Sequence, residues 1–327
     1  MKILYIHCGY ETIYPYLEDW LIKGFEANRI EVEIISSEPS LQDVQQMIIN
    51  KKPLFAFTMI GNKLHIDLIK FLKQEQIPLV IWLTEDPYYT DQSLQKMKIA
   101  DIIFTIDLGS YNYYKQSNYN NIYYLPLGTN ESTFNSRVVD EPYTSDLLLL
   151  GFPYPSRVAL IEEILKNTKY NVTLVGKGWR IRIQKKYRFR HKITIIDKWV
   201  PPELVAQYYN GAKIVLNPHR ESNYAMNKNS LEIKNKSINN RTFDIAACGN
   251  FQLIEHKQDV FHQFSSEEMI TYENTNDCLN KIFYYMENET ERAKIALLAR
   301  ERALSHHTMT ERAKTIIQTV LSEKTPF

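Results

Sequence analysis

Short apolar runs alternate with amphipathic segments along almost the whole chain. In the first part of the sequence, six runs are typical of strands: 2–6, 31–35, 54–59, 79–84, 102–105 and 122–126. Apolar residues recur at helical spacing in three intervening segments: 16–28, 41–50 and 65–74. Strands that are almost continuously apolar and alternate with helices indicate a parallel sheet covered on both faces. The first part is therefore predicted to be an α/β domain.

A polar segment, Thr129–Thr144, interrupts this alternation and shows no period. A second series follows, with apolar runs or helical patterns at 146–150, 157–165, 172–175, 193–196, 202–209, 214–216, 241–248 and 251–254. Two successive series of this kind predict an α/β fold of two Rossmann-like domains that face each other across a cleft. We expect an N-terminal domain at 1–140, a C-terminal domain at 141–305 and a terminal helix within 306–327.

Composition narrows the class of protein. The 327 residues are 44% hydrophobic and 24% charged with a net charge of +1, so no overall attraction to nucleic acid or a membrane surface is expected. Cys8, Cys248 and Cys278 lack metal-ligand spacing, which favours a reducing compartment and argues against a disulfide framework or a zinc site. No signal peptide and no apolar window long enough to span a membrane are found, so a cytoplasmic protein is expected.

Basic residues gather between Arg180 and Lys192, with Tyr187 and Phe189 interleaved among them. Such a run usually forms a solvated face, and contact with an anionic polymer or a membrane surface is the alternative. Because no nucleic-acid-binding motif accompanies the run, we predict no nucleic-acid partner.

The stretch 237–255 carries the most specific chemistry. A helix that begins at about Asn240 would end at Gly249, a residue type suited to the left-handed conformation that follows a helix. Its first turn would present Asn240, Arg241 and free backbone N–H groups to phosphate oxygens. Asp244, one turn further on, would accept hydrogen bonds from ribose hydroxyls. A solvated helix position for Asp244 and a simple salt bridge for Arg241 are the alternatives.

A second stretch, 208–220, places a buried strand before polar residues. The apolar run 214–216 leads into Asn217, His219 and Arg220. Polar side chains at the carboxyl end of a parallel strand have no packing purpose, so these three are predicted to contact a ligand.

Together these stretches resemble the donor half of GT-B glycosyltransferases, and most closely the CgeB/YkvP-like family of spore-associated, glycosyltransferase-related proteins. The segments 281–286, 291–292 and 306–308, with Arg312, extend the resemblance, which covers about residues 120–315. It implies a nucleoside diphosphate sugar as substrate, with a UDP-type donor favoured, and neither a cofactor nor a metal. It also implies a terminal helix that crosses back to the N-terminal domain, and association with the spore or its coat.

The sequence departs from many retaining GT-B enzymes at one place. Those enzymes carry a glutamate eight positions before the ribose-binding carboxylate, whereas this chain has Lys236. The sugar-binding role of that glutamate is therefore not carried over, and retention and inversion both stay open.

Two glycine turns complete the predicted donor side. Gly151 follows the first strand of the second half and permits close backbone approach, and Arg157 would open the next helix. After another strand, Lys177 would face the diphosphate, and Trp179 would stack on a base or shape its pocket. A tight turn with an exposed lysine is the alternative. Neither turn has the spacing of a dinucleotide-binding or Walker loop.

On the acceptor side, His7 and Gly9 follow the opening strand, and Glu85 and Asp86 follow a later strand of the same sheet. Parallel strands end on one edge, so these residues are expected to line one acceptor pocket. Glu85 or Asp86 is predicted to be the general base for the acceptor hydroxyl, with helix capping as the alternative. Arg241 is the third predicted catalytic residue, because its guanidinium would neutralise charge on the departing diphosphate.

The predicted function is transfer of a sugar from a nucleoside diphosphate to an acceptor, which is a polysaccharide, a protein or a small molecule. Two alternatives stay open: a catalytically silent nucleotide-sugar-binding or spore-coat assembly protein on the same fold, and a GT-B-type sugar epimerase. Lys236 favours the silent protein. Incubation with nucleotide sugars separates the three, which would give transfer or hydrolysis, binding alone, or a new epimer.

Overall fold

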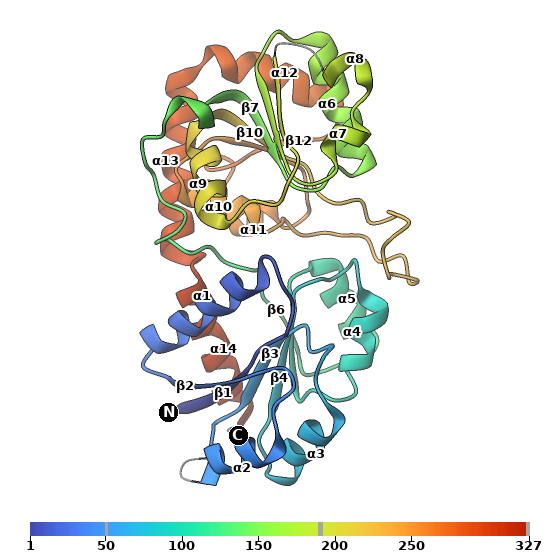
Figure 1. Ribbon diagram of the computed structural model, residues 1–327, viewed down its shortest axis with the longest axis vertical. Helices are drawn as coiled ribbons and strands as arrows, with labels where there is room; N and C mark the ends of the chain where they lie inside the picture. Colours follow the sequence, from blue (N-terminus) through green and yellow to red (C-terminus); the bar gives the residue numbers. More distant parts are fainter. Residues whose placement is uncertain (50–51, 189–191, 325–327) are drawn as a thin grey trace. The chain divides into compact units, whose positions relative to one another are not determined.

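The computed structural model describes residues 1–49, 52–188 and 192–324, and Figure 1 shows the course of the chain. Two compact units are formed, each from separate segments of the sequence. Unit 1 contains Met1–Leu127, Ala225–Ser237 and Met309–Phe327, and unit 2 contains Gly128–Tyr224 and Ile238–Thr308. The chain therefore passes from unit 1 to unit 2 and back twice.

Unit 1 is built on a six-stranded parallel sheet in the order β2-β1-β3-β4-β5-β6. Its strands are β1 Lys2–Ile6, β2 Glu31–Ile35, β3 Ala56–Met59, β4 Leu79–Leu83, β5 Ile102–Thr105 and β6 Ile122–Tyr124. Its helices are α1 Tyr14–Ala27, α2 Leu41–Ile49, α3 Ile66–Gln74, α4 Thr90–Lys96, α5 Leu108–Gln116 and α14 Met309–Lys324. The strand order reverses at β1, which pairs with both β2 and β3. Ligands of such sheets bind beyond the carboxyl ends of the strands at this reversal.

The C-terminal helix α14 packs against α1, although these helices come from opposite ends of the chain (Figure 1). A Cβ atom at Gly24 of α1 would lie 2.8 Å from the Met309 carbonyl oxygen, so glycine permits the close approach. Arg312 Nε donates to the Pro126 carbonyl oxygen at 2.7 Å. The buried apolar residues of α14 are Met309, Ala313, Ile316, Ile317 and Val320. Apolar burial and a buried charge-assisted hydrogen bond therefore hold α14 in unit 1.

Unit 2 is built on a second six-stranded parallel sheet, in the order β12-β11-β10-β7-β8-β9. Its strands are β7 Ser145–Leu150, β8 Val172–Val175, β9 Ile193–Ile196, β10 Ala212–Asn217, β11 Gln252–Glu255 and β12 Ile270–Tyr272. Its helices are α6 Pro155–Asn167, α7 Trp179–Arg182, α8 Lys185–Arg188, α9 Pro202–Gly211, α10 Arg241–Ala247, α11 Val260–Gln263, α12 Thr275–Glu287, α13 Glu289–His306 and the 3₁₀ helix η1 Glu141–Tyr143. Here the order reverses between β7 and β10, which pair directly.

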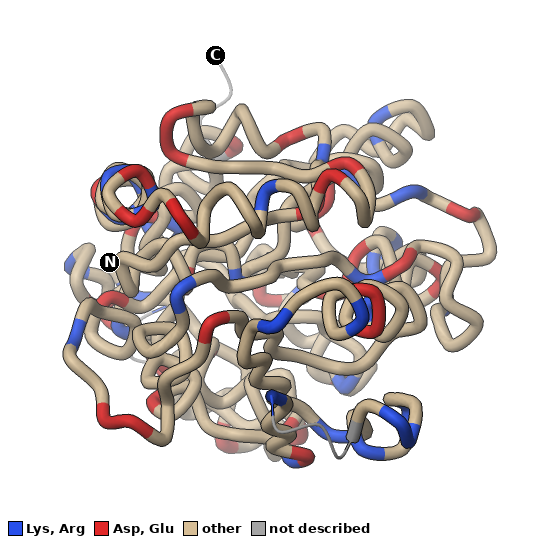
Figure 2. Tube along the Cα trace, turned by 90° about the horizontal axis from the view of Figure 1, so that it is seen from above, with Lys and Arg blue, Asp and Glu red and all other residues tan. Residues whose placement is uncertain are grey.

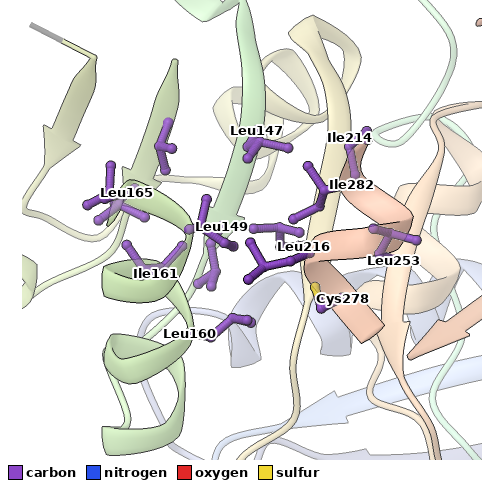
Figure 3. Packing of buried hydrophobic residues seen from close by; sticks show 14 of the residues in the cluster. Leu147, Leu149, Leu160, Ile161, Leu165, Ile214, Leu216, Leu253, Cys278 and Ile282 are labelled. Carbon is purple, nitrogen blue, oxygen red and sulfur yellow. The ribbon is translucent and has the colours of Figure 1, made fainter. Parts of the chain in front are cut away.

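One hydrophobic core of unit 2 lies between its sheet and the helices α6 and α12 (Figure 3). Leu147 and Leu149 of β7 point to the same face because alternate residues of a strand do so. They pack with Leu216 of β10, Ile161 of α6 and Ile282 of α12. Each fully buried leucine or isoleucine stabilises the fold by about 1.5–3 kcal/mol relative to exposure.

The strand predictions are confirmed with shifts of one or two residues at their ends. Elements that the sequence did not predict are strand β12 and the helices α4, α5, η1, α7, α8, α11, α12 and α13. Helix α5 begins with Leu108-Gly109-Ser110, which has no clear apolar period, so its start depends on the N-terminal cap. Asp107 Oδ1 accepts the Ser110 N–H at 2.7 Å, so a hydrogen bond and not apolar periodicity starts this helix.

The predicted helix 41–50 is described as far as Ile49, and Asn50 lies outside the described residues. The basic run 180–192 falls on α7 and α8, and Phe189 and Arg190 also lie outside them. Figure 2 shows Lys and Arg mixed with Asp and Glu along most of the trace. Among the helices of the described residues, none is long and apolar enough to span a membrane.

Candidate functional site

The reversal of strand order in unit 2 places two predicted donor-side turns next to each other. β7 ends at Leu150 and is followed by Gly151, and the adjacent β10 ends at Asn217 and is followed by Pro218. Two arginines converge on this point, Arg157 from α6 and Arg241 from the start of α10. The edge of the sheet where a ligand is expected is thus cationic.

Both guanidiniums hydrogen-bond to the same peptide oxygen. Arg157 Nη2 and Arg241 Nη2 each donate to the Pro218 carbonyl at 2.9 Å. Arg157 also donates to the Phe152 carbonyl at 3.0 Å, and Arg241 donates to the Leu150 carbonyl. Carbonyl oxygens orient a guanidinium without cancelling its charge, so these bonds hold two cationic forks in place.

Gly151 is required by this arrangement. Its φ of +129° is in the region that favours glycine, and a Cβ there would lie 2.7 Å from Arg241 Nη1 and 2.8 Å from Arg157 Nη1. Any side chain at this position would displace both cations. The predicted close backbone approach at Gly151 is therefore made by the two arginines.

Asp244 is buried, which excludes the solvated helix position considered from the sequence. It lies on α10 with 5% of its surface exposed, and α10 ends as predicted, with Gly249 at a φ of +70°. Asn240 Nδ2 approaches Asp244 Oδ2 at 3.5 Å, whereas Oδ1 makes no hydrogen bond to a described residue. Burial raises the pKa of Asp244 to about 8, although the positive charge of Arg241 and the nearby hydroxyl of Thr129, which is not placed to complete a hydrogen bond, both act to lower it. A large fraction of this carboxyl is therefore protonated at pH 7.

Asn217 and His219 differ although both are buried. The Asn217 amide donates to Thr242 Oγ1 and Gln252 Oε1 and accepts from Asn239, each at 3.0 Å. Asn217 therefore joins three elements of the protein itself, and its predicted contact with a ligand is not supported by this geometry. His219 is 2% exposed, and neither ring nitrogen hydrogen-bonds to a described residue.

His219 lines a polar cavity of about 310 Å³ beyond the carboxyl ends of β10, β11 and β12. Arg220 and Lys257 line the same cavity, and Glu255 Oε2 lies 3.8 Å from His219 Nδ1, too far for a hydrogen bond. Burial lowers the pKa of His219 to about 4, so the ring is neutral at pH 7 and has one donor and one acceptor.

The second glycine turn separates the two roles predicted for Trp179. Trp179 is fully buried, and its indole N–H donates to the Gly151 carbonyl at 2.9 Å, so its ring is not exposed for stacking on a base and it supports the first turn instead. Lys177, in contrast, is exposed. The carbonyl oxygen of Gly151 would also lie 2.4 Å from a Cβ at Gly176, which shows how closely these turns pack.

On the acceptor side, His7 and Gly9 lie in the turn after β1. His7 Nδ1 is 3.0 Å from Glu18 Oε2, and a Cβ at Gly9 would lie 2.6 Å from Ser37 Oγ. The φ of Gly9 is +71°, so glycine serves the turn itself. Neither residue lines the neighbouring cavity of unit 1 described below.

Glu85 and Asp86 are neighbours in the chain with opposite environments. Asp86 is 1% exposed and accepts hydrogen bonds from Ser93 Oγ at 2.5 Å, Thr105 Oγ1 at 2.8 Å and Tyr114 Oη at 3.1 Å. Burial raises its pKa to about 7, although the Ser93 and Thr105 hydroxyls oppose the shift. A carboxylate enclosed by three hydroxyls of its own chain cannot reach an acceptor, so the prediction of Asp86 as a base is corrected.

Glu85, in contrast, lines a cavity of about 270 Å³ in unit 1. The Tyr14 hydroxyl donates to Glu85 Oε1 at 2.5 Å and lies 3.1 Å from Thr84 Oγ1. Further lining residues that the sequence analysis did not identify are Tyr10, Tyr14, Asn62, Tyr89 and Gln92. Their signal was position, since they follow β1, β3 and β4 at one edge of the sheet.

Asp107 anchors the end of the segment Ala225–Ser237 in unit 1. Its Oδ2 accepts from Lys236 N at 2.9 Å, Ser237 N at 3.2 Å and Asn235 Nδ2 at 3.0 Å. Lys236, the departure noted in the sequence, therefore lies in a segment anchored to unit 1. Within the described ranges, no three His, Cys, Asp or Glu side chains are placed to hold a metal ion.

Comparison with known proteins agrees with this architecture. The glycosyl transferase-like family matches residues 157–318. Spore protein CgeB of Bacillus subtilis (strain 168) is 40% identical over 296 residues, which cover 90% of this chain and 91% of CgeB.

Two solved structures have similar folds. Sucrose-phosphate synthase from Thermosynechococcus elongatus superimposes with a TM-score of 0.68 and 11% identity, covering 98% of this chain and 99% of that one. HepE of Anabaena, solved with UDP and glucose, has a TM-score of 0.68 and 12% identity, covering 98% and 100%. The sequence relationship shows the family and the structural likeness shows the fold: the chain belongs to the CgeB-like family of glycosyltransferases and has the GT-B fold.

Proposed function

We propose that this protein transfers a sugar from a UDP-type nucleotide sugar, and that unit 2 binds the donor. The observation that carries this proposal is the convergence of Arg157 and Arg241 on one carbonyl beside the buried carboxyl of Asp244. Two cationic forks suit the two phosphates of a diphosphate, which offers several oxygens within reach of both. An adjacent carboxyl suits the ribose that follows them.

The ribose assignment is supported by Asp244 Oδ1, which has no hydrogen-bond partner among the described residues. A buried polar oxygen without a partner costs free energy, and native proteins seldom leave one unsatisfied. A ribose hydroxyl donating to Asp244 Oδ1 would remove that cost. Because the carboxyl is largely protonated at pH 7, it could donate to a second hydroxyl as well.

The proposed roles in transfer divide between the units. In unit 2, Arg241 would stabilise the negative charge that develops on the leaving diphosphate. In unit 1, Glu85 is the proposed group that accepts the proton of the attacking hydroxyl, and Tyr14 holds its carboxylate in one orientation. Asp86 has no part in this step.

The relatives support the class of donor and suggest where the protein acts. The HepE structures contain UDP, UDP with glucose, and UDP-glucose. CgeB is named a spore protein, and we extend spore association to this chain on the strength of 40% identity. The acceptor would then be a component of the spore surface.

Calorimetric titration of the full chain with UDP, GDP and dTDP tests the donor class, and mass spectrometry after incubation with UDP-glucose tests transfer or hydrolysis. We expect UDP to bind more tightly than GDP or dTDP, and UDP-glucose to be consumed. Binding without turnover over a range of acceptors would indicate a silent nucleotide-sugar-binding protein. No binding of any of the three nucleotides would contradict the donor site itself.

A further inference from the structure

The cavity of unit 1 has a composition that singles out one class of ligand. It lies beyond the carboxyl ends of β3 and β4, against the start of α4, and measures about 270 Å³. Three tyrosines, two amides, two hydroxyls and one carboxylate supply its polar chemistry: Tyr10, Tyr14, Tyr89, Asn62, Gln92, Thr84, Ser93 and Glu85. Ile60 and Leu83 complete the lining.

The aromatic side chains give the cavity flat, weakly polar surfaces. The ring centroids of Tyr10 and Tyr14 are 5.6 Å apart and their ring planes are inclined by 46°, so the two rings form adjacent, inclined surfaces. Lys63 Nζ lies 5.0 Å from the centroid of the Tyr10 ring and donates to the Gly9 carbonyl. Tyrosine rings accept apolar C–H surface while their hydroxyls remain available to polar groups.

The side-chain amides of Asn62 and Gln92 both line the cavity and are joined by a hydrogen bond. Asn62 Nδ2 donates to Gln92 Oε1 at 2.7 Å and to the Tyr10 hydroxyl at 3.2 Å, which occupies both of its N–H groups. Asn62 Oδ1, an acceptor, and Gln92 Nε2, a donor, make no hydrogen bond to a described residue. Hydroxyl groups can both donate and accept, so each of these two atoms can bind a hydroxyl of one ligand.

The charge of the lining disfavours anionic ligands. No lysine or arginine is among the described residues that line the cavity, and Glu85 is the one charged group among them. A phosphate or carboxylate placed there would meet the like charge of Glu85. A ligand with apolar C–H faces, several hydroxyls and no negative charge satisfies all three observations.

We propose that this cavity binds a neutral sugar ring, and that Asn62 and Gln92 select it by binding its hydroxyls. The assignment rests on the proposed transferase function, in which the ring belongs to the acceptor and Glu85 receives a proton from one of its hydroxyls. Nucleotide binding in unit 2 does not depend on it. The acceptor is thereby narrowed from any nucleophile to a neutral carbohydrate.

Ligand-observed NMR on the full chain saturated with UDP tests the proposal. The probes are the methyl α-glycosides of glucose and galactose, with glucuronate as the anionic analogue. We expect at least one neutral glycoside to bind, and glucuronate to bind more weakly. Removing one of the two amides in Asn62→Ala or Gln92→Ala should raise the dissociation constant about three- to tenfold.

Gln45→Ala is the matched control, because Gln45 is an exposed glutamine on α2 of the same unit. It should leave glycoside affinity unchanged, and all three variants should keep the wild-type affinity for UDP. The proposal is overturned if neither neutral glycoside binds, if glucuronate binds at least as tightly, or if Asn62→Ala and Gln92→Ala do not alter glycoside affinity. If the wild-type chain binds a glycoside but does not bind UDP, the assignment of the cavity stands and the assignment of the donor site in unit 2 fails.

Discussion

Each unit buries a carboxyl group near the carboxyl edge of its sheet, and the two groups are satisfied very differently. Asp86 of unit 1 accepts hydrogen bonds from three hydroxyls of α4, β5 and α5. Asp244 of unit 2 has one oxygen without a partner among the described residues. Burial raises the pKa of both, to about 7 and about 8.

A shifted pKa therefore does not separate a structural acid from a functional one, because desolvation acts on both. What separates them is whether the protein completes the hydrogen bonds of the acid. Asp86 needs nothing further and holds three elements together. Asp244 gains from a ligand that supplies what the chain does not.

The largest effect is expected when the satisfied acid is removed. Asp86→Ala should lower the free energy of unfolding of unit 1 by about 3 kcal/mol, because three buried hydroxyls lose their acceptor. Hydrogen exchange of peptides from α4 and α5 measures this loss locally. Asp86→Asn, which keeps an acceptor oxygen, should lose less. If Asp86→Ala keeps the wild-type protection from hydrogen exchange in α4 and α5, Asp86 does not stabilise unit 1 and the comparison with Asp244 fails.

Removal of the unsatisfied acid should affect binding and not stability. Asp244→Ala is expected to weaken UDP binding by about 1–3 kcal/mol, or roughly 5- to 150-fold. Binding of inorganic pyrophosphate, which has no ribose, should change little. Calorimetric titration gives both affinities, and Asp140→Ala, at an exposed aspartate of unit 2, serves as the control. Equal losses for UDP and pyrophosphate would place Asp244 away from the ribose.

The arginine beside Asp244 sharpens the contrast within unit 2. Arg241→Lys keeps a positive charge but loses the planar fork, so UDP affinity should fall by about 1–2 kcal/mol. Uridine, which lacks phosphates, should bind as before. Arg180→Lys, at an exposed arginine of the same unit, is the matched control. A parallel loss of uridine affinity would mean that Arg241 supports the fold of the site and not the diphosphate.

Both acids should make the protein less stable as pH rises. The pKa of Asp86 and that of Asp244 lie above the usual aspartate value, so the folded state binds more protons than the unfolded state between about pH 4 and pH 8. Stability falls through this range, by at most about 1.4 kcal/mol per pH unit for each acid. Thermal unfolding from pH 5 to pH 8 should show a shallower slope in Asp244→Asn. An unchanged slope would mean that Asp244 is ionised throughout.

The smallest effect concerns metals. If the open oxygen of Asp244 awaits a ribose and not a cation, EDTA should change UDP affinity by less than about twofold, well under 1 kcal/mol. Titrations with and without EDTA, and with added magnesium or manganese, measure this. A loss restored by either metal would make Asp244 a candidate ligand for a cation and would undo the comparison.

Local patterns predicted much of this molecule. Nearly continuous apolar runs identified eleven strands, because buried parallel strands leave few polar positions. The end of α10 at Gly249 was equally readable, since a left-handed residue after a helix favours glycine. Arg241 and Asp244 came with that helix, as they are three positions apart on it and their proximity is a local property.

The cavity in unit 1 could not be predicted in the same way. Tyr10, Asn62 and Gln92 come from three turns or helices separated by long stretches of sequence, and only the order of strands in the sheet brings them together. Trp179 shows a related limit. No period distinguishes an indole that faces a ligand from one that lies under a glycine turn.

The adjacent carboxylates Glu85 and Asp86 separate what the sequence determined from what the tertiary structure decided. The sequence alone determined that two acids follow a buried strand and therefore lie at the ligand-binding edge of a parallel sheet. Only the fold decided which of them faces the cavity. Tertiary packing brings three hydroxyls to Asp86, those of Ser93, Thr105 and Tyr114. Because burying a carboxyl without hydrogen-bond partners costs free energy, these hydroxyls make Asp86 the acid that can be buried.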